Sequence, residues 1–201
     1  MIQERLKALR AEMEKRGITV YVVPTADFHE SEYVGDHFKA RKFITGFTGS
    51  AGTAVITLDE AGLWTDGRYF VQAENQLKDS TVTLYRMGEE GVPTVDEFVK
   101  DRLKEGGCLG FDGRVVNGTW GGKLEKIAAE KNVSMHVTED LIDLIWEDRP
   151  ALSKQPLFIL EEKYSGKSTA DKIADLRKAM KENGADAVSY THLRAHETRR
   201  H

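Results

Sequence analysis

The alternation of short β-branched runs with amphipathic segments is the feature that most constrains this chain. Apolar, β-branched or aromatic runs of strand length occur at residues 18–23, 53–58, 63–65, 81–85, 109–111 and 135–137. Between them, apolar residues three to four apart predict helices before residue 17, at 69–77, at 94–104, around 124–128 and, as a short helix, at 141–145. Strands and helices in this order predict an α/β fold in which helices cover a sheet.

Several element ends carry specific signals. Gly17 supplies the left-handed residue that ends the first helix. Thr94 and Glu97 form a capping box, because each side chain can satisfy the free backbone amide of the other residue. The glycines of residues 46–52 predict a tight turn in which two backbones approach.

Charge and cysteine content exclude several classes of protein. The 201 residues carry a net charge of −4, with both signs interspersed, which does not match the basic stripe of a nucleic-acid-binding protein. The apolar runs are far shorter than the ~20 residues that cross a bilayer. The single cysteine, Cys108, cannot form an internal disulfide, so we expect a cytoplasmic protein in which this thiol is buried and structural.

An internal repeat indicates duplication. Residues 5–17 match residues 172–184 at a constant offset. The matched pairs are Leu6 and Ile173, Leu9 and Leu176, Arg10 and Arg177, Met13 and Met180, and Gly17 and Gly184. We therefore expect a linker at 150–156 and the start of a second, truncated copy at 157–188. Residues 189–201 have neither strand alternation nor a helical stripe, and we interpret them as a non-native tail.

Three motifs that suggest catalysis or binding have simpler explanations. Gly166-Lys167-Ser168-Thr169 lacks the earlier glycine of a phosphate-binding loop, and Ser168 with Asp171 predicts a helix cap. His29 and the acids around it predict solvated loop contacts. In the tail, the histidines are spaced wrongly for a zinc helix or lack a third ligand.

Four stretches of the sequence resemble the Xaa-Pro aminopeptidase family. They are YVVPTADFHESEY at 21–33, RKFITGFTGSAGTAVIT at 41–57, LWTDGRYFVQA at 63–73 and IWEDRP at 145–150. The resemblance is closest to the three-domain cytosolic aminopeptidase P type. It implies a creatinase/prolidase N-terminal-like domain at residues 1–149, with a mixed sheet flanked by helices, followed by the truncated second copy.

The same resemblance implies an activity and its cofactors. Members of the family remove the N-terminal residue from peptides whose second residue is proline. They use two divalent ions, usually manganese, whose ligands belong to a C-terminal domain and would lie beyond residue 201. We therefore expect no catalytic residue and no metal ligand in this chain, no activity of the chain alone, and a homodimer as a possible assembly.

Arg68 is the candidate substrate-binding residue. From the residues alone, it is a turn arginine paired with Asp66 or Glu74. In the family that this chain resembles, the arginine of the Trp-Thr-Asp-Gly-Arg-Tyr motif contacts the bound peptide, and by position that residue is Arg68. Asp66 and Gly67 would then form the turn, with Trp64 packed behind it.

Two other functional hypotheses remain. The chain could be a stand-alone peptide-binding or regulatory module, for which peptide affinity should fall in Arg68→Ala. It could also be an artefactual gene fragment, for which the apolar helix face in residues 157–188 predicts aggregation.

Overall fold

The computed structural model describes residues 2–156 and 158–187. Contacts divide the chain into two units, one up to Leu152 and one from Ser153. The first unit contains α1 (Ile2–Lys15), β1 (Val20–Pro24), the 3-10 helix η1 (Asp36–Phe38), α2 (Ala40–Thr45), β2 (Thr53–Thr57), β3 (Ala61–Thr65), α3 (Phe70–Leu77), β4 (Thr83–Arg86), α4 (Val95–Arg102), β5 (Cys108–Phe111), α5 (Gly118–Glu130) and β6 (Ser134–His136). The second unit contains α6 (Glu162–Ser165) and α7 (Thr169–Glu182).

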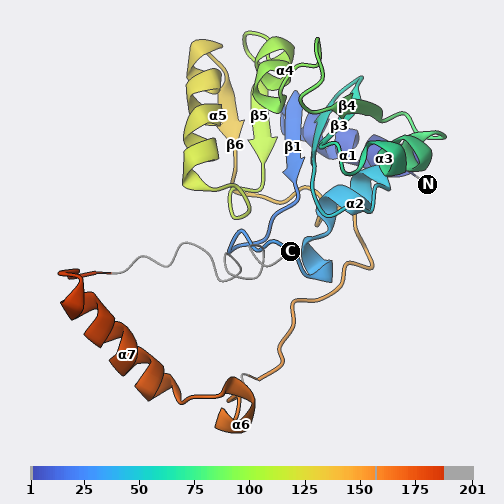
Figure 1. The fold of residues 1–201 in the computed structure, drawn as a ribbon. Coiled ribbons are helices and arrows are strands. Elements are labelled where there is room, and N and C mark those ends of the chain that lie inside the picture. Colours follow the sequence, from blue (N-terminus) through green and yellow to red (C-terminus); the bar gives the residue numbers. More distant parts are fainter. Residues whose placement is uncertain (1, 157, 188–201) are drawn as a thin grey trace. The chain divides into compact units, whose positions relative to one another are not determined.

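The six strands form one mixed sheet in the order β4-β3-β2-β1-β5-β6 (Figure 1). Strand β2 is antiparallel to β1 and β3, and the remaining neighbours are parallel. In the register, Val22 lies opposite Val55 on one side and Phe111 on the other. The predicted α/β class and mixed sheet are confirmed.

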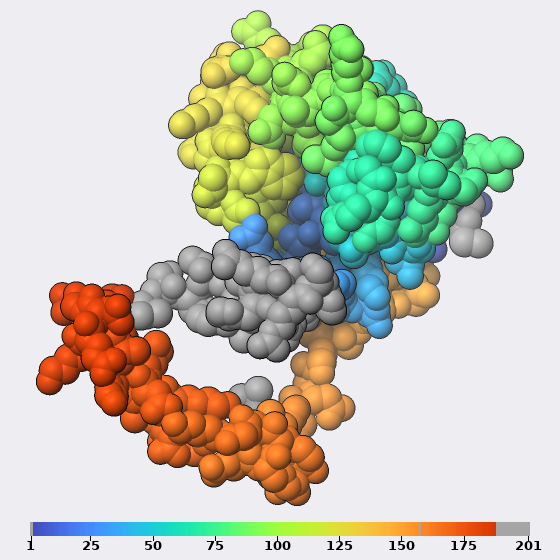
Figure 2. Space-filling model, in the orientation of Figure 1, coloured from blue at the N-terminus to red at the C-terminus, as the bar shows by residue number. Residues whose placement is uncertain are grey.

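Helices cover both faces of this sheet, and each face has its own core. Helices α1, α2 and α3 contribute Leu9, Phe43 and Ala73 to the core that contains Tyr21 and Ile56. Helices α4 and α5 supply the opposite core, whose members include Val22, Val55, Trp64, Phe98 and Leu124. Helices α4 and α5 contact each other, and in Figure 2 their green and yellow atoms adjoin. Consecutive strand residues point to opposite faces, so β1 is buried along its whole length.

Trp64 anchors the second core, as the sequence predicted. Its side chain is fully buried, its ring stacks on Tyr85 with a centroid distance of 4.1 Å, and its Nε1 donates to the Pro93 carbonyl at 2.8 Å. Gly62 leaves the room for this stack, because a Cβ there would lie 2.6 Å from Trp64 and 2.7 Å from Tyr85. Cys108 is buried in the first core, which confirms the structural thiol.

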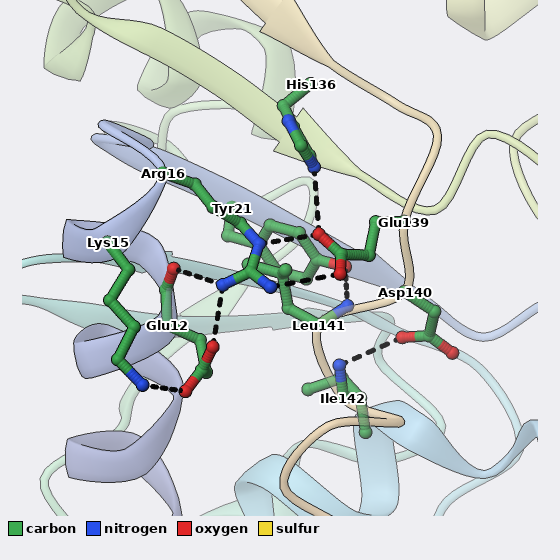
Figure 3. A network of polar contacts seen from close by, with 9 residues as sticks. All are labelled: Glu12, Lys15, Arg16, Tyr21, His136, Glu139, Asp140, Leu141 and Ile142. Atoms are coloured by element: carbon green, nitrogen blue, oxygen red, sulfur yellow. Dashed lines mark hydrogen bonds and ion pairs between the residues drawn. The ribbon is translucent and has the colours of Figure 1, made fainter.

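A polar network holds the chain that follows β6 against α1 and β1 (Figure 3). Glu139 accepts from Arg16 Nε at 2.5 Å and from Arg16 Nη2 at 3.0 Å. His136 Nε2 lies 3.3 Å from the same carboxylate. The backbone amide of Leu141 donates to the Tyr21 hydroxyl at 3.0 Å. These contacts place Leu141 in the first core.

The short helix predicted at 141–145 is wrong, because this segment forms a series of turns. The amide of Ile145 bonds to the carbonyl of Ile142, and the amide of Arg149 bonds to the carbonyl of Trp146. The Arg149 side chain then donates to the His37 carbonyl at 2.9 Å and to Asp140 at 2.6 Å. The long-range bond to His37 holds the chain near residue 37, so the apolar residues are buried without a continued helix.

Helix α7 has the same length and the same kind of ending as α1. Both helices have 14 residues, and their bounds differ by the offset found in the sequence. Gly17 and Gly184 follow them with φ of 67° and 61°. The amide after each glycine bonds at 2.9 Å to the carbonyl of the matching methionine. Burial differs, because Leu9 is fully buried whereas Leu176 is 48% exposed.

Candidate functional site

The candidate site lies at the end of the sheet where most of its strands finish, which is called the carboxyl edge or simply the edge from here on. Strands β1, β3, β4 and β5 end there and β2 begins there, as the pairing directions require. The loop after β1, the turn after β3 and the turn after β5 therefore gather at the same edge. Ligands of open α/β sheets bind beyond the carboxyl ends of the strands, so this edge is where a ligand contact is expected.

The glycine-rich segment 46–52 forms part of this edge. Gly46 ends α2 with φ of 81°. Gly52 has φ of 154°, and a Cβ there would lie 2.8 Å from the Trp64 carbonyl oxygen. Two backbones thus approach as the sequence predicted, and a strand follows, so the glycines are required by local geometry.

Arg41 holds this segment from within. Its Nε donates to Thr25 Oγ1 at 2.9 Å and its Nη1 donates to the Phe47 carbonyl at 2.6 Å, while Nη2 donates to the Gly49 carbonyl. The side chain is buried, and burial lowers the pKa of Arg41 to about 10, so it stays charged at neutral pH. Sequence analysis did not identify this residue, because no local pattern distinguishes a buried arginine from an exposed one.

Arg68 is presented by a turn that directly follows β3. Its backbone amide donates to Asp66 Oδ1 at 3.1 Å, its Nε donates to the same oxygen at 2.9 Å, and its Nη2 donates to Oδ2 at 2.8 Å. The Asp66 carbonyl accepts from the Tyr69 amide at 3.0 Å. The predicted pairing with Asp66 is confirmed, whereas Glu74 pairs with Arg86 instead.

The Arg68 guanidinium is charged, exposed and held in one orientation. Its side chain is 70% exposed. The hydrogen bonds that Arg68 donates to Asp66, and then the charge of Asp66, raise the pKa of Arg68, and the Glu32 carboxylate adds to this effect. Because Asp66 takes Nε and Nη2, the Nη1 end of the fork lies outside this pair. A guanidinium held in this way suits a carbonyl or a carboxylate.

Tyr69 and Ser50 connect this turn to the glycine-rich segment. The Tyr69 hydroxyl lies 2.7 Å from Ser50 Oγ. The hydrogen bond to Ser50 lowers the pKa of the Tyr69 hydroxyl, and the nearby Arg68 charge acts in the same direction. The two loops of the edge are therefore fixed to each other.

Two hollows open along the edge. One of about 440 Å³ has Asp66 on its wall together with Val115 and Asn117. Another of about 270 Å³ is lined by Arg41 and the residues around it. Thr25, Glu32 and Ser50 line both hollows, so the hollows are neighbours.

The histidines near this edge form loop contacts. The His29 amide donates to Asp27 Oδ1 at 2.9 Å, and His37 Nδ1 lies 2.8 Å from the Pro150 carbonyl oxygen. Glu30 accepts from the Asn117 side-chain amide at 2.5 Å. Within residues 2–156 and 158–187, no three His, Cys, Asp or Glu side chains are grouped so that they could hold a metal ion. The tail histidines at 192, 196 and 201 lie outside the described residues.

The rejected phosphate-loop motif is a helix cap, as predicted. Ser168 precedes α7, and its Oγ accepts from the Asp171 amide at 3.1 Å. None of the described helices has the length and apolar character needed to cross a membrane.

The fold and the edge together define a three-layered α/β domain that presents a fixed arginine at the carboxyl ends of its strands. Residues 5–145 match the model of the creatinase/prolidase N-terminal domain, and this chain belongs to that family. A second model with the same description matches residues 148–195. That match extends past residue 188. The predicted ends of the first domain at 149, of the linker at 156 and of the second copy at 188 stay predictions.

Several relatives are named as aminopeptidases. The chain is 44% identical over 187 residues to a probable Xaa-Pro aminopeptidase P of Sordaria macrospora, covering 92% of this chain and 30% of the relative. It is 38% identical to aminopeptidase P2 of Arabidopsis thaliana, covering 94% of this chain and 27% of the relative. The chain thus spans about 30% of the length of the curated relatives that it matches.

Solved structures give the same relationship. The X-prolyl aminopeptidase of Caenorhabditis elegans, described as a cytosolic enzyme with a di-nuclear active site, is 33% identical with a TM-score of 0.78 over 92% of this chain and 32% of its own. An aminopeptidase P from Streptococcus thermophilus is 19% identical with a TM-score of 0.52, which shows the shared fold alone.

Proposed function

We propose that this chain is the non-catalytic N-terminal part of a metal-dependent Xaa-Pro aminopeptidase, a hydrolase that removes the N-terminal residue from peptides with proline in second position. The aminopeptidase names of its relatives support this assignment. Both matching family models describe N-terminal domains, and together they account for residues 5–145 and 148–195. The chemistry of hydrolysis then belongs to a separate catalytic domain.

The described residues do not fit the metal centre of such an enzyme, because they contain no group of ligands for even one ion. The two divalent ions, manganese in our expectation, would be bound by the catalytic domain. A cytoplasmic location is part of the proposal, since the neighbour from Caenorhabditis elegans is described as cytosolic.

Arg68 is proposed to contact the bound peptide. The observation that carries this role is the exposed guanidinium, held by Asp66 at the carboxyl edge of the sheet beside a hollow of about 440 Å³. An exposed ion pair of this kind contributes little to stability, so stability is a weak reason for fixing the side chain. A charge-assisted hydrogen bond to a peptide is worth about 1.5–3 kcal/mol once water is excluded.

Peptide titration tests this role. Amide signals of the ¹⁵N-labelled chain are followed while Ala-Pro-Ala is added. We expect shifts at residues 66–69 and at least about a tenfold loss of affinity in Arg68→Ala. Arg102→Ala is the matched control. The Arg102 guanidinium also pairs through Nε and Nη2, in this case with Glu60, and Glu60 lies in the turn between β2 and β3 at the opposite edge. Equal affinity of Arg68→Ala and the wild type would contradict the role.

An activity assay tests the assignment as non-catalytic. The chain alone is incubated with Arg-Pro-Pro and added manganese, and release of free arginine is measured. We expect no release. Turnover that depends on the chain would show that it carries its own catalytic centre.

A further inference from the structure

A second Asp-Gly-Arg turn lies at the same edge of the sheet. The tripeptide of residues 66–68 occurs again at residues 112–114. The first copy directly follows the last residue of β3, and the second directly follows the last residue of β5. Since β3 and β5 run in the same direction, both turns leave the sheet at the same side.

The two turns have the same hydrogen bonds. The Arg114 amide donates to Asp112 Oδ1 at 3.0 Å, its Nε donates to the same oxygen at 2.9 Å, and its Nη2 donates to Oδ2 at 3.0 Å. Each value lies within 0.2 Å of its counterpart in the Arg68 turn. In both turns, the arginine therefore bonds to its own aspartate through Nε and Nη2, and Nη1 does not take part in the pair.

Packing of the glycines does not explain the recurrence. A Cβ at Gly113 would lie 2.7 Å from the Val137 carbonyl oxygen, so this position requires glycine. At Gly67, the nearest atom would be 3.8 Å away, and a side chain would fit. The two turns therefore share the aspartate–arginine pair, and they do not share a steric requirement for glycine.

The Arg114 guanidinium is exposed to solvent, and the aspartate that it pairs with is buried. Its side chain is 60% exposed, while the Asp112 side chain is only 9% exposed. The guanidinium carbon also lies 5.4 Å from the centre of the Phe28 ring. The cation is thus held in place on two sides, as a fixed recognition group would be.

The two turns flank one groove. The hollow of about 440 Å³ has Asp66 of the first turn on its wall, together with Val115, which directly follows Arg114, and Asn117, which caps α5. Strands β3 and β5 are separated by β2 and β1, which is three steps of ~4.8 Å, or ~14 Å. An extended peptide advances ~3.4 Å per residue, so about four residues cover this distance.

We propose that Arg114 is a second peptide-binding residue, which pairs with a carboxylate about four residues along the peptide from the residue that Arg68 contacts. This inference rests on the proposed function and adds a preference for longer, acidic peptides. A carboxylate is the partner that a guanidinium fork binds best, through two parallel hydrogen bonds. An acidic side chain and a free C-terminus offer the same chemistry.

A spacing series tests the inference. The probes are Ala-Pro-(Gly)n-Asp amides with n from 0 to 5 and the matching Asn peptides, titrated into the ¹⁵N-labelled chain. We expect the wild type to bind the Asp peptide about tenfold more tightly than the Asn peptide at one spacing. In Arg114→Gln this ratio falls to one, while Arg68→Ala weakens both peptides and keeps the ratio. Arg102→Ala leaves both affinities unchanged.

Two further arms complete the design. All-glycine peptides with a free C-terminal carboxylate separate a terminal carboxylate from an acidic side chain. Because Arg114→Gln leaves the buried Asp112 without its cation, Arg114→Lys serves as a folded variant that keeps the charge and loses the fork. We expect it to retain only part of the Asp preference.

The possible failures are distinguishable. An Asp/Asn ratio of one at every spacing, or a ratio that Arg114→Gln does not change, overturns the inference while Arg68 keeps its role. If Arg68→Ala leaves the affinity for every peptide unchanged, the proposed Arg68 contact is wrong. A wild-type chain that binds none of the peptides overturns both.

Discussion

Replacing Arg149 by methionine tests how the segment after β6 is held. The Arg149 and Asp140 side chains are 8% and 6% exposed, and Nη1 lies 2.6 Å from the Asp140 carboxylate. Removing one partner of such a buried pair costs about 3–5 kcal/mol, because it leaves the other charge uncompensated. This is a large share of the about 5–15 kcal/mol that stabilises a typical domain.

Urea unfolding followed by tryptophan fluorescence measures this loss. The three tryptophans all lie in the first unit, at positions 64, 120 and 146, so the signal reports that unit. With a urea dependence of about 2 kcal/mol per molar, we expect the midpoint of Arg149→Met to fall by about 1.5–2.5 M.

Two variants make this prediction refutable. Arg86→Met removes an arginine whose pair with Glu74 is exposed, and it should cost less than about 1 kcal/mol. Adding Asp140→Asn to Arg149→Met removes the uncompensated charge and keeps an acceptor for the Ile142 amide, so the double variant should be more stable than Arg149→Met. A loss in Arg149→Met no larger than in Arg86→Met would refute the reasoning.

Three further predictions concern packing, a cap and pH. Gly62→Ala should cost about 1–3 kcal/mol and change the near-UV circular dichroism, since the new Cβ meets the Trp64 ring; an unchanged spectrum and stability would contradict this. Thr94→Ala should lower the free energy of unfolding by about 1 kcal/mol through loss of the capping box, and Thr94→Ser should retain most of it. The hydrogen bond from Arg16 lowers the pKa of Glu139 below its usual 4.5, so its contribution is present above pH 4.5 and is lost as the pH falls below it. Glu139→Gln should therefore weaken the fall in stability in acid, and identical pH profiles would count against the pair.

Local signals predicted most elements of the fold. Tight turns and caps depend on residues a few positions apart, which is why Gly17, the Thr94 box and the Ser168 cap could be identified. The Asp66–Arg68 pair is also local, because only Gly67 separates the two residues. The same reasoning failed at 141–145, because bonds to Tyr21 and His37, more than a hundred residues away, decide that backbone.

The sequence by itself determined most of the helices and strands, though not α2, and where one helix is repeated, since these properties follow from neighbours along the chain. It also indicated Asp66 as one of two partners for Arg68, and the structure selected Asp66. Only the tertiary structure decided that β2 is antiparallel within a mixed sheet, that Arg41 is buried, and that the turns after β3 and β5 face the same groove. Those features depend on which strands pair across the sheet, and pairing is set by the joint burial of two apolar faces rather than by any short stretch of residues.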